Sequence, residues 1–339
     1  YGSLTAPEDP GSGGSGRQTV DDGPGGAGGG AVKIVASGLV TVNGTISANG
    51  VGAGMNGTGS GGAVYINCLA FAGNGSVSAN GGDSGGSSAS GGGGGRIAVV
   101  YNLTAQSNQN LSAKPTASFS ANDGDGPYIT IRALPGTLHF SDSSFFPPDS
   151  GILKGGQIAI AGFTNWRPGS VSVSGGLAAF TNMNLYVTND VSISGFGGIL
   201  ISDVVMEVGM NVTLSNTPPY STHARSIVYG TPTRSLTVHG NMNLLSKAAL
   251  HFYSLGTNAA TLDVGGNLVL SNAASYLYVY SGCTNAPDPD YGALVRAGGR
   301  RDVTPGAVYS VSDPTNGGSP LFRCEDLWGG TNAVFNATA

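Results

Sequence analysis

The sequence predicts an all-β protein, a parallel β-solenoid with long glycine-rich loops, and two observations carry this prediction. The phrase Asn43-Gly-Thr-Ile-Ser-Ala-Asn-Gly50 returns 31 residues later as Asn74-Gly-Ser-Val-Ser-Ala-Asn-Gly81, and a degenerate copy follows at 118–124. Self-similarity at a period of roughly 20–50 residues is typical of solenoids. The chain is also rich in Ser, Thr, Asn, Gly, Val and Tyr, which favour strands and turns, and it contains no amphipathic helical pattern.

The glycine content could indicate disorder, but the rest of the composition argues against it. Glycine accounts for 59 of 339 residues, and only 10% of the residues are charged. Glycine-rich chains without the triplet period of collagen are often disordered. Here 40% of the residues are apolar, and Val, Ile and Leu alternate in runs between the glycine patches. We therefore expect an ordered chain.

Charge and hydropathy exclude two classes of protein. The net charge is −5, with only 14 Lys and Arg residues, so the basic surface of a nucleic-acid-binding protein is missing. No apolar run approaches the length of a membrane-spanning helix. The chain begins Tyr1-Gly-Ser-Leu4 without an initiator Met or a secretory leader, so we expect a processed or partial chain.

The first part of the chain predicts a lead-in and glycine-rich coils. Residues 1–30 form a Gly/Pro-rich lead-in, and the solenoid is expected over 31–280, with glycine-rich repeats at 31–133. Strands of alternating character follow glycine runs at 30–34, 62–66 and 95–99. We expect the glycine tracts to be ordered loops whose backbones approach closely, because a Cβ would keep stacked loops apart.

The second part, residues 134–280, repeats a nine-residue frame. Four segments share the order apolar, any, Val, any, Gly/Asn/Met, Asn/Asp, apolar, any, apolar, and they lie at 185–193, 206–214, 236–244 and 262–270. The frame predicts two inward-facing strands joined at a corner, where Asn or Asp bends the chain by tolerating left-handed backbone. Stacked Asn side chains are expected to form a hydrogen-bonded ladder. Strands of about 3–6 residues in about 10–13 coils should result, with tyrosines on one face at 275–280.

These motifs resemble a known kind of protein. The runs Gly59-Ser-Gly-Gly-Ala-Val-Tyr-Ile66 and Gly91–Tyr101 are similar to the glycine-rich repeats of large secreted bacterial β-helix proteins. The Leu-x-Val-x-Gly-Asn-Leu-x-Leu frame resembles passenger repeats of autotransporter-like surface proteins. The resemblance covers roughly residues 25–280. It implies a right-handed parallel β-helix, secretion, and a role at the cell surface, in a matrix or in an appendage.

The sequence offers little chemistry for catalysis, so we expect no enzyme. A polysaccharide lyase or hydrolase on this fold would need acids at matching positions of neighbouring coils. The acidic residues are interpreted as lying at different frame positions, namely Asp142, Asp149, Asp190, Asp203, Glu207 and Asp263. The four histidines show no metal-ligand spacing, and His239 and His251 are expected at the surface.

One segment resembles a calcium loop. Asn122, Asp123 and Asp125 alternate with glycine in Asn122-Asp-Gly-Asp-Gly126, but no distal bidentate Glu follows. An ordinary turn is the favoured interpretation, since Asp-Gly pairs are common turn residues. No other cofactor is predicted.

The three cysteines differ in their surroundings. Cys68 lies in an apolar run and is expected to be a buried free thiol. Cys283 and Cys324 lie in polar segments and are candidates for one disulfide, with three free thiols as the alternative.

Residues 281–339 are expected to be a C-terminal cap or an interaction segment. Trp328, Val334 and Phe335 are the candidate assembly residues, because 332–339 is short, uncharged and alternating. Such a strand pairs either with the edge of a neighbouring subunit or with its own solenoid. The leading hypothesis is an extracellular or cell-surface structural protein that self-associates into a homopolymeric fibre or surface layer. The alternatives are a monomeric adhesin or carbohydrate-binding rod that contacts polysaccharide, and a polysaccharide-active enzyme.

Overall fold

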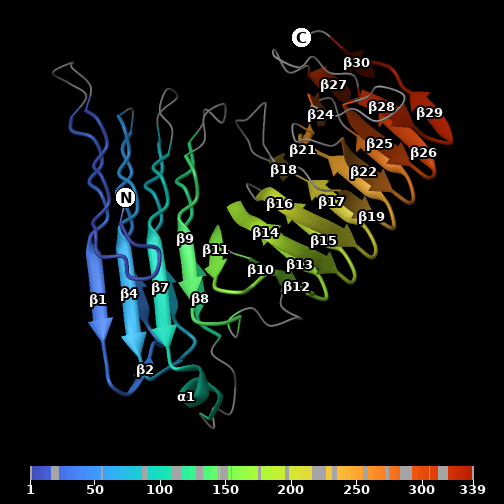
Figure 1. Cartoon of the computed structure of the whole chain (residues 1–339). Helices are drawn as coiled ribbons and strands as arrows, with labels where there is room; N and C mark the ends of the chain where they lie inside the picture. The colour runs from blue at the N-terminus through green and yellow to red at the C-terminus, as the bar shows by residue number, and fades with distance from the viewer. Residues whose placement is uncertain are drawn as a thin grey trace. The chain divides into compact units, whose positions relative to one another are not determined.

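The computed structural model describes most of the chain and is nearly all β. It has 52% strand and 2% helix, with long parallel sheets, which confirms the all-β prediction (Figure 1). The described residues are 2–16, 23–54, 56–85, 91–108, 116–126, 133–143, 145, 152–153, 155–174, 177–194, 198–215, 227–230, 235–254, 259–271, 275–282, 292–304, 306–311 and 320–337. The chain divides into unit 1 (1–147, 154–163 and 176–179) and unit 2 (148–153, 164–175 and 180–339), which are described separately.

Unit 1 consists of three parallel strand ladders, β1–β4–β7–β9–β11, β2–β5 and β3–β6–β8. The register pairs Ile46 with Val77, so the 31-residue interval between the two copies of the phrase is the length of chain that returns to the same ladder position. Its elements are β1 (Ala31–Val35), β2 (Leu39–Thr41), β3 (Thr45–Ser47), β4 (Ala63–Cys68), β5 (Ala70–Ala72), β6 (Ser76–Ser78), β7 (Arg96–Tyr101), α1 (Leu103–Asn108), β8 (Ser118–Ser120), β9 (Thr137–Phe140) and β11 (Gly156–Ile160).

Unit 2 also stacks parallel strands in long ladders, including β10–β13–β15–β17–β20–β23–β26–β29. The others run β16–β18–β21–β24–β27–β30 and β16–β19–β22–β25–β28, and β12 pairs with β14. The first strands are β10 (Ile152–Leu153), β12 (Asn165–Trp166), β13 (Val171–Ser174), β14 (Leu177–Val187, of which 177–179 belong to unit 1), β15 (Val191–Ser194), β16 (Gly198–Val208), β17 (Val212–Ser215) and β18 (Ile227–Gly230). The later strands are β19 (Leu236–Val238), β20 (Met242–Leu245), β21 (Ala249–Ser254), β22 (Ala260–Val264), β23 (Leu268–Ser271), β24 (Tyr276–Ser281), β25 (Ala293–Ala297), β26 (Arg300–Thr304), β27 (Ala307–Val311), β28 (Pro320–Arg323), β29 (Asp326–Gly329) and β30 (Val334–Asn336).

Alternating apolar residues of the strands form the core, as the period-2 pattern predicts. Val32, Ile34 and Ile46 of the first strands are partly buried against it. The corresponding residues of later strands are fully buried, among them Val64, Ile66, Val77, Ile97, Val99, Val187, Val208, Val238, Leu244, Val264 and Leu270. Helix α1 closes one edge of the unit 1 core, where the buried Gln106 amide accepts from the backbone N–H of Phe71 and donates to its carbonyl oxygen.

Two strands are longer than the expected 3–6 residues, because a left-handed residue lets each bend without ending. β14 and β16 each span 11 residues. Asn182 in β14 has φ 52° and Asp203 in β16 has φ 54°, values that Asn and Asp tolerate better than other residues with a Cβ. The first half of β16 pairs with β18 and its second half with β19. Each long strand therefore supplies two successive ladder strands.

The sixth position of the nine-residue frame, which is Asn or Asp in all four segments, lies at a corner and forms the expected ladder. The backbone N–H of each residue donates to the side-chain oxygen of its predecessor, at 2.9 Å in every step, through Asp190, Asn211, Asn241, Asn267 and Arg300. The frame's Asn and Asp residues have no positive φ, so the expected left-handed bend at them is wrong. They satisfy the backbone of the next coil instead of bending their own.

The glycine tracts of unit 1 form an ordered bundle, which confirms the expectation of close backbone packing. They lead into β1, β4, β7 and β9 as parallel traces (Figure 1). Gly26 and Gly29 donate backbone hydrogen bonds to Gly57 and Ser60, at 2.9 Å each. This spacing of three residues is the repeat of a polyproline II helix. In the tract 91–95, Gly92, Gly94 and Gly95 donate to backbone carbonyls of neighbouring segments.

Both ends of the described chain belong to this architecture. In the lead-in, Gly11 and Gly14 donate backbone hydrogen bonds to Gly29 and Gly26, at 2.8 Å each, so the lead-in is part of the glycine bundle. Residues 281–339, expected to form a cap or interaction segment, supply β25–β30 to the ladders of unit 2. The parallel strands therefore extend beyond residue 280.

Candidate functional site

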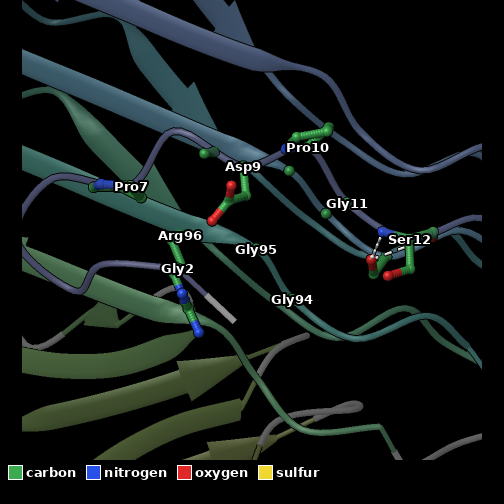
Figure 2. Close-up of a pocket in the computed structure, with 13 residues that line it drawn as sticks. Gly2, Pro7, Asp9, Pro10, Gly11, Ser12, Gly94, Gly95 and Arg96 are labelled. Carbon is green, nitrogen blue, oxygen red and sulfur yellow. Dashed lines mark hydrogen bonds between the residues drawn. The ribbon is translucent and has the colours of Figure 1, made fainter.

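The lead-in encloses a cavity of about 400 Å³ with the starts of β4 and β7 (Figure 2). Most of its wall is backbone, because glycines of three segments line it, together with Pro7 and Pro10. These segments lie this close because they have no side chains. A β-carbon at Gly11, for example, would overlap the carbonyl oxygen of Ser60. The wall of the cavity is therefore mostly backbone.

Two charged side chains of opposite sign reach the cavity next to Gly2. The point that a β-carbon of Gly2 would occupy lies 2.5 Å from Asp9 Oδ2 and 2.8 Å from Arg96 Nη1. Figure 2 shows the Asp9 carboxylate directed towards the strand that carries Arg96. Within the described parts of the chain, neither side chain has a hydrogen-bonding or ion-pair partner. The acceptor oxygens of Asp9 and the donor nitrogens of Arg96 are therefore free to bind a ligand.

Two serines add hydroxyl groups, of which that of Ser60 is fixed in place. The Ser12 backbone N–H donates to Ser60 Oγ at 2.7 Å, and this hydroxyl donates to the Ser12 carbonyl oxygen at 3.2 Å. The lining combines one carboxylate, one guanidinium, two hydroxyls and backbone groups. Such a set can donate and accept hydrogen bonds over a short distance. The sequence did not point to this site, because Asp9 lies in a segment interpreted only as a lead-in.

A row of charged side chains lies on an outward face of unit 2. His239 Nε2 lies 2.7 Å from Glu207 Oε1, and both side chains are about half exposed. Arg296 donates through Nε to Asp263 Oδ1 at 2.8 Å and through Nη2 to Oδ2. The hydrogen bond from Arg296 lowers the pKa of Asp263, and Asp263 raises the pKa of Arg296. Asp263 is therefore held as an ionised partner of Arg296.

The interpretation that these acids fall at different frame positions is wrong for two of them. Glu207 and Asp263 both occupy the second position of the frame, and Thr237 lies between them in register. His239 occupies the fourth position and is exposed at the surface, as expected. Alignment of the four frame segments by column would have shown this row from the sequence.

An aromatic ladder occupies another outward face of unit 2, as the alternation at 275–280 predicts. Tyr253 stacks on Tyr280 at 4.1 Å between ring centroids, and Tyr278 stacks on Tyr309 at 4.9 Å and on His251 at 4.5 Å. Burial raises the pKa of Tyr278 to about 12. Because the ring faces cover one another, this ladder presents mainly ring edges and hydroxyls to a partner.

The backbone of the calcium-candidate segment is hydrogen-bonded to side chains of the preceding coil. Asn122 N–H donates to Asn80 Oδ1 at 2.9 Å, and Asp125 N–H donates to Asp83 Oδ1 at 2.8 Å. Asp123 is buried. Calcium binding by Asn122, Asp123 and Asp125 stays a prediction. Across the described ranges, no group of three or more His, Cys, Asp or Glu side chains is placed to hold a metal ion.

The described cysteines are both free thiols. Cys68 is buried, as expected, and burial raises its pKa to about 11. Cys324 is half-buried and free, so the structure contains no disulfide at it, and Cys283 lies outside the described residues. Cys324 directly follows β28, near Arg301, which is buried and stacks on Phe322 at 4.5 Å.

The candidate assembly residues gather on the last strands. Trp328 is 45% exposed, Val334 42% and Phe335 48%, and Leu327 joins them at 59%. The guanidinium of Arg300 lies over the ring of Trp328 at 4.9 Å. The sequence identified three of these four residues and missed Leu327.

Comparisons with known proteins add no assignment to this geometry. Neither protein-family models, nor curated proteins, nor solved structures gave a match to the chain. Within the described residues, no helix is long and apolar enough to cross a membrane.

Proposed function

We propose that this protein is an extracellular structural protein, the subunit of a homopolymeric fibre or surface layer at the cell surface. Its fold in this proposal is a right-handed parallel β-helix. The parallel ladders support the fold, because successive strands return to the same ladders throughout each unit. Connections between parallel strands of one sheet are right-handed in almost all proteins.

The observation that carries the proposal is the exposure of apolar side chains on the last coil. Phe335 continues the row in which Leu277 and Val308 are buried, and yet it is 48% exposed. Leu327 continues another buried row and is 59% exposed. Among the described residues β28, β29 and β30 each pair with a strand on one side only, so a free strand edge accompanies this apolar surface.

The first coil offers a surface that matches it. Val32 and Ile34 are only partly buried, whereas their partners Val64 and Ile66 are fully buried. A further parallel coil on β1 would complete their burial. Contact between the last coil of one copy and the first coil of the next is heterologous, and such contacts generate an open filament when their rotation does not close.

In the described chain β30 pairs in parallel with β27 of its own chain, from Val334 with Ala307 to Asn336 with Tyr309. This pairing supports the alternative in which the C-terminal strand joins its own sheet, and exchange of the strand between subunits stays a prediction. Assembly in this proposal uses the second, free edge of β30, so no segment needs to leave its own subunit.

Electron microscopy of the 339-residue chain tests the proposal. We expect fibres or sheets of uniform width, which the double substitution Leu327→Asp and Phe335→Asp abolishes, because it places charge in the end-to-end contact. Met210→Asp is the matched control, since Met210 is 47% exposed at a corner between β16 and β17 and should leave assembly unchanged. Circular dichroism establishes that both variants remain folded. Separate particles for the unaltered chain, or fibres that persist in the double variant, would contradict the proposal.

A monomeric adhesin or carbohydrate-binding rod is the second candidate, and the cavity beside the lead-in favours it. A rod of this kind would sediment as a monomer while still binding a glycan. Glycan binding and the oligomeric state can be tested separately, because the cavity and the exposed last coil involve different residues.

A further inference from the structure

We propose that the cavity beside the lead-in binds a neutral polyhydroxylated ligand, a sugar residue of a glycan. This inference goes beyond the assembly proposed above and does not depend on it, because none of the cavity residues belongs to the last coil. Three properties of the cavity carry it: its size and surface, its balance of charge, and the fixed positions of its backbone wall and of the Ser60 hydroxyl.

The size and surface suit a small, polar ligand. A volume of about 400 Å³ lies within the usual range for ligand sites, roughly 300–1,000 Å³, and accommodates one or two sugar rings. Glycine backbone and the rings of Pro7 and Pro10 give wall surfaces on which the C–H face of a sugar can lie. No aromatic or aliphatic side chain larger than Ala63 or the prolines lines the cavity, so a large apolar ligand would find little to contact.

The charges favour a neutral ligand. Asp9 and Arg96 carry opposite charges at the same part of the cavity, and neither is neutralised by a partner among the described residues. An anionic ligand would be attracted by Arg96 and repelled by Asp9, and a cationic ligand would be attracted by Asp9 and repelled by Arg96. Adjacent hydroxyls of a sugar serve both groups, because a hydroxyl can donate to the carboxylate and accept from the guanidinium.

Part of the polar lining is held in place before a ligand arrives. The backbone of Arg96 is fixed as the first residue of β7, which pairs with β4 and β9. Ser60 Oγ accepts from the Ser12 backbone N–H and donates to the Ser12 carbonyl oxygen. A ligand would therefore order the side chains of Asp9 and Arg96, but not the backbone wall or the Ser60 hydroxyl, which limits the entropic cost of recognition.

The test is binding of defined sugars to the 339-residue chain, by isothermal titration calorimetry and NMR. The neutral probes are glucose, galactose, mannose, N-acetylglucosamine and their β-linked disaccharides; glucuronate and glucosamine are the charged probes. We expect at least one neutral probe to bind with a Kd of about 1 mM or tighter. Asp9→Asn and Arg96→Gln should each weaken that binding about tenfold, since each removes a charged hydrogen-bonding partner.

Glu8→Gln is the matched control for Asp9→Asn. Glu8 is the adjacent acid, but it accepts a hydrogen bond from Lys33 at 2.6 Å and does not line the cavity. Its substitution also removes one negative charge and should leave the affinity unchanged. Circular dichroism checks that Arg96→Gln remains folded; if it does not, Asp9→Asn on the exposed lead-in decides alone. Absence of binding by every neutral probe, preference for a charged probe, or equal binding by Asp9→Asn and the unaltered chain would overturn the inference.

Discussion

The α-carbon of Gly136 lies so close to the carbonyl oxygen of Gly95 that a β-carbon on Gly136 would overlap this oxygen. The two residues directly precede β9 and β7, which are neighbours in one ladder. The same relationship recurs between Gly62 and Gly30, before β4 and β1. Absence of a side chain at these positions is therefore a condition for the ladder to form.

Gly136→Ala should destabilise unit 1 by about 3 kcal/mol or more, because the overlap is with backbone that cannot rotate away. The measurement is urea unfolding followed by circular dichroism. Gly38→Ala is the control: a β-carbon there would meet nothing within 4 Å, and the change in the free energy of unfolding should stay within about 0.5 kcal/mol. Equal effects of the two substitutions would contradict this account of the glycine bundle.

Asn241→Ala should lower the stability of unit 2 by about 1 kcal/mol, since it removes the acceptor of the Asn267 backbone N–H. Asn243→Ala provides the comparison. Asn243 lies two residues further on and has no hydrogen-bonding partner for its side chain in the described part of the chain. A smaller effect of Asn241→Ala than of Asn243→Ala in the same urea titration would refute the proposed contribution of the ladder.

Cys68 should resist alkylation in the folded protein. Its pKa is raised to about 11, from an ordinary value of 9.0, because burial disfavours the thiolate, and its side chain is shielded from reagent. With iodoacetamide at pH 8, peptide mass spectrometry should find modified Cys324, which is half-buried, and unmodified Cys68. In urea both should react. Equal modification of the two thiols under native conditions would show that Cys68 is not in the core.

The aromatic ladder should make stability fall at high pH. Burial raises the pKa of Tyr278 to about 12 from an ordinary value of 10.0, and a second contribution comes from Tyr309. Between pH 10 and 12 the unfolded chain loses this phenol proton while the folded chain keeps it. The free energy of unfolding therefore decreases as pH rises through that range.

Tyr278→Phe should reduce this loss of stability at high pH. The measurement is the free energy of unfolding of the variant and of the unaltered chain, at pH 7 and between pH 10 and 12. In a pH titration of the variant followed by absorbance at 295 nm, the tyrosine ionisation step at the highest pH should also be missing. An unchanged pH dependence in the variant would mean that the phenol of Tyr278 is not buried within the ladder.

Local patterns predicted much of the fold, because the ladders repeat the same residue types at the same places. Ile46 and Val77 belong to the repeated phrase and are register partners. The ladder through Asn211 and Asn241 follows from the nine-residue frame. The bend at Asp203 was not predicted, because nothing in the sequence distinguishes an Asn or Asp that bends its own chain from one that satisfies the next coil.

The sites were harder to predict, since they depend on contacts between distant segments. Asp9 and Arg96 both line the cavity only because the lead-in packs into the glycine bundle, and no spacing in the sequence indicates that packing. The exposure of Leu327 likewise reflects its place in the last coil. Its neighbours in the same row, Leu268 and Arg301, are buried by the coils that follow them.

X-ray fibre diffraction from aligned assemblies of the 339-residue chain tests the central claim most directly. If parallel β-helical subunits stack end to end, the strands lie across the fibre axis, and a strong meridional reflection at about 4.8 Å should appear. It should be absent from preparations of the Leu327→Asp and Phe335→Asp double variant. Fibres whose 4.8 Å reflection lies on the equator, or a chain that yields no ordered assembly, would contradict the account.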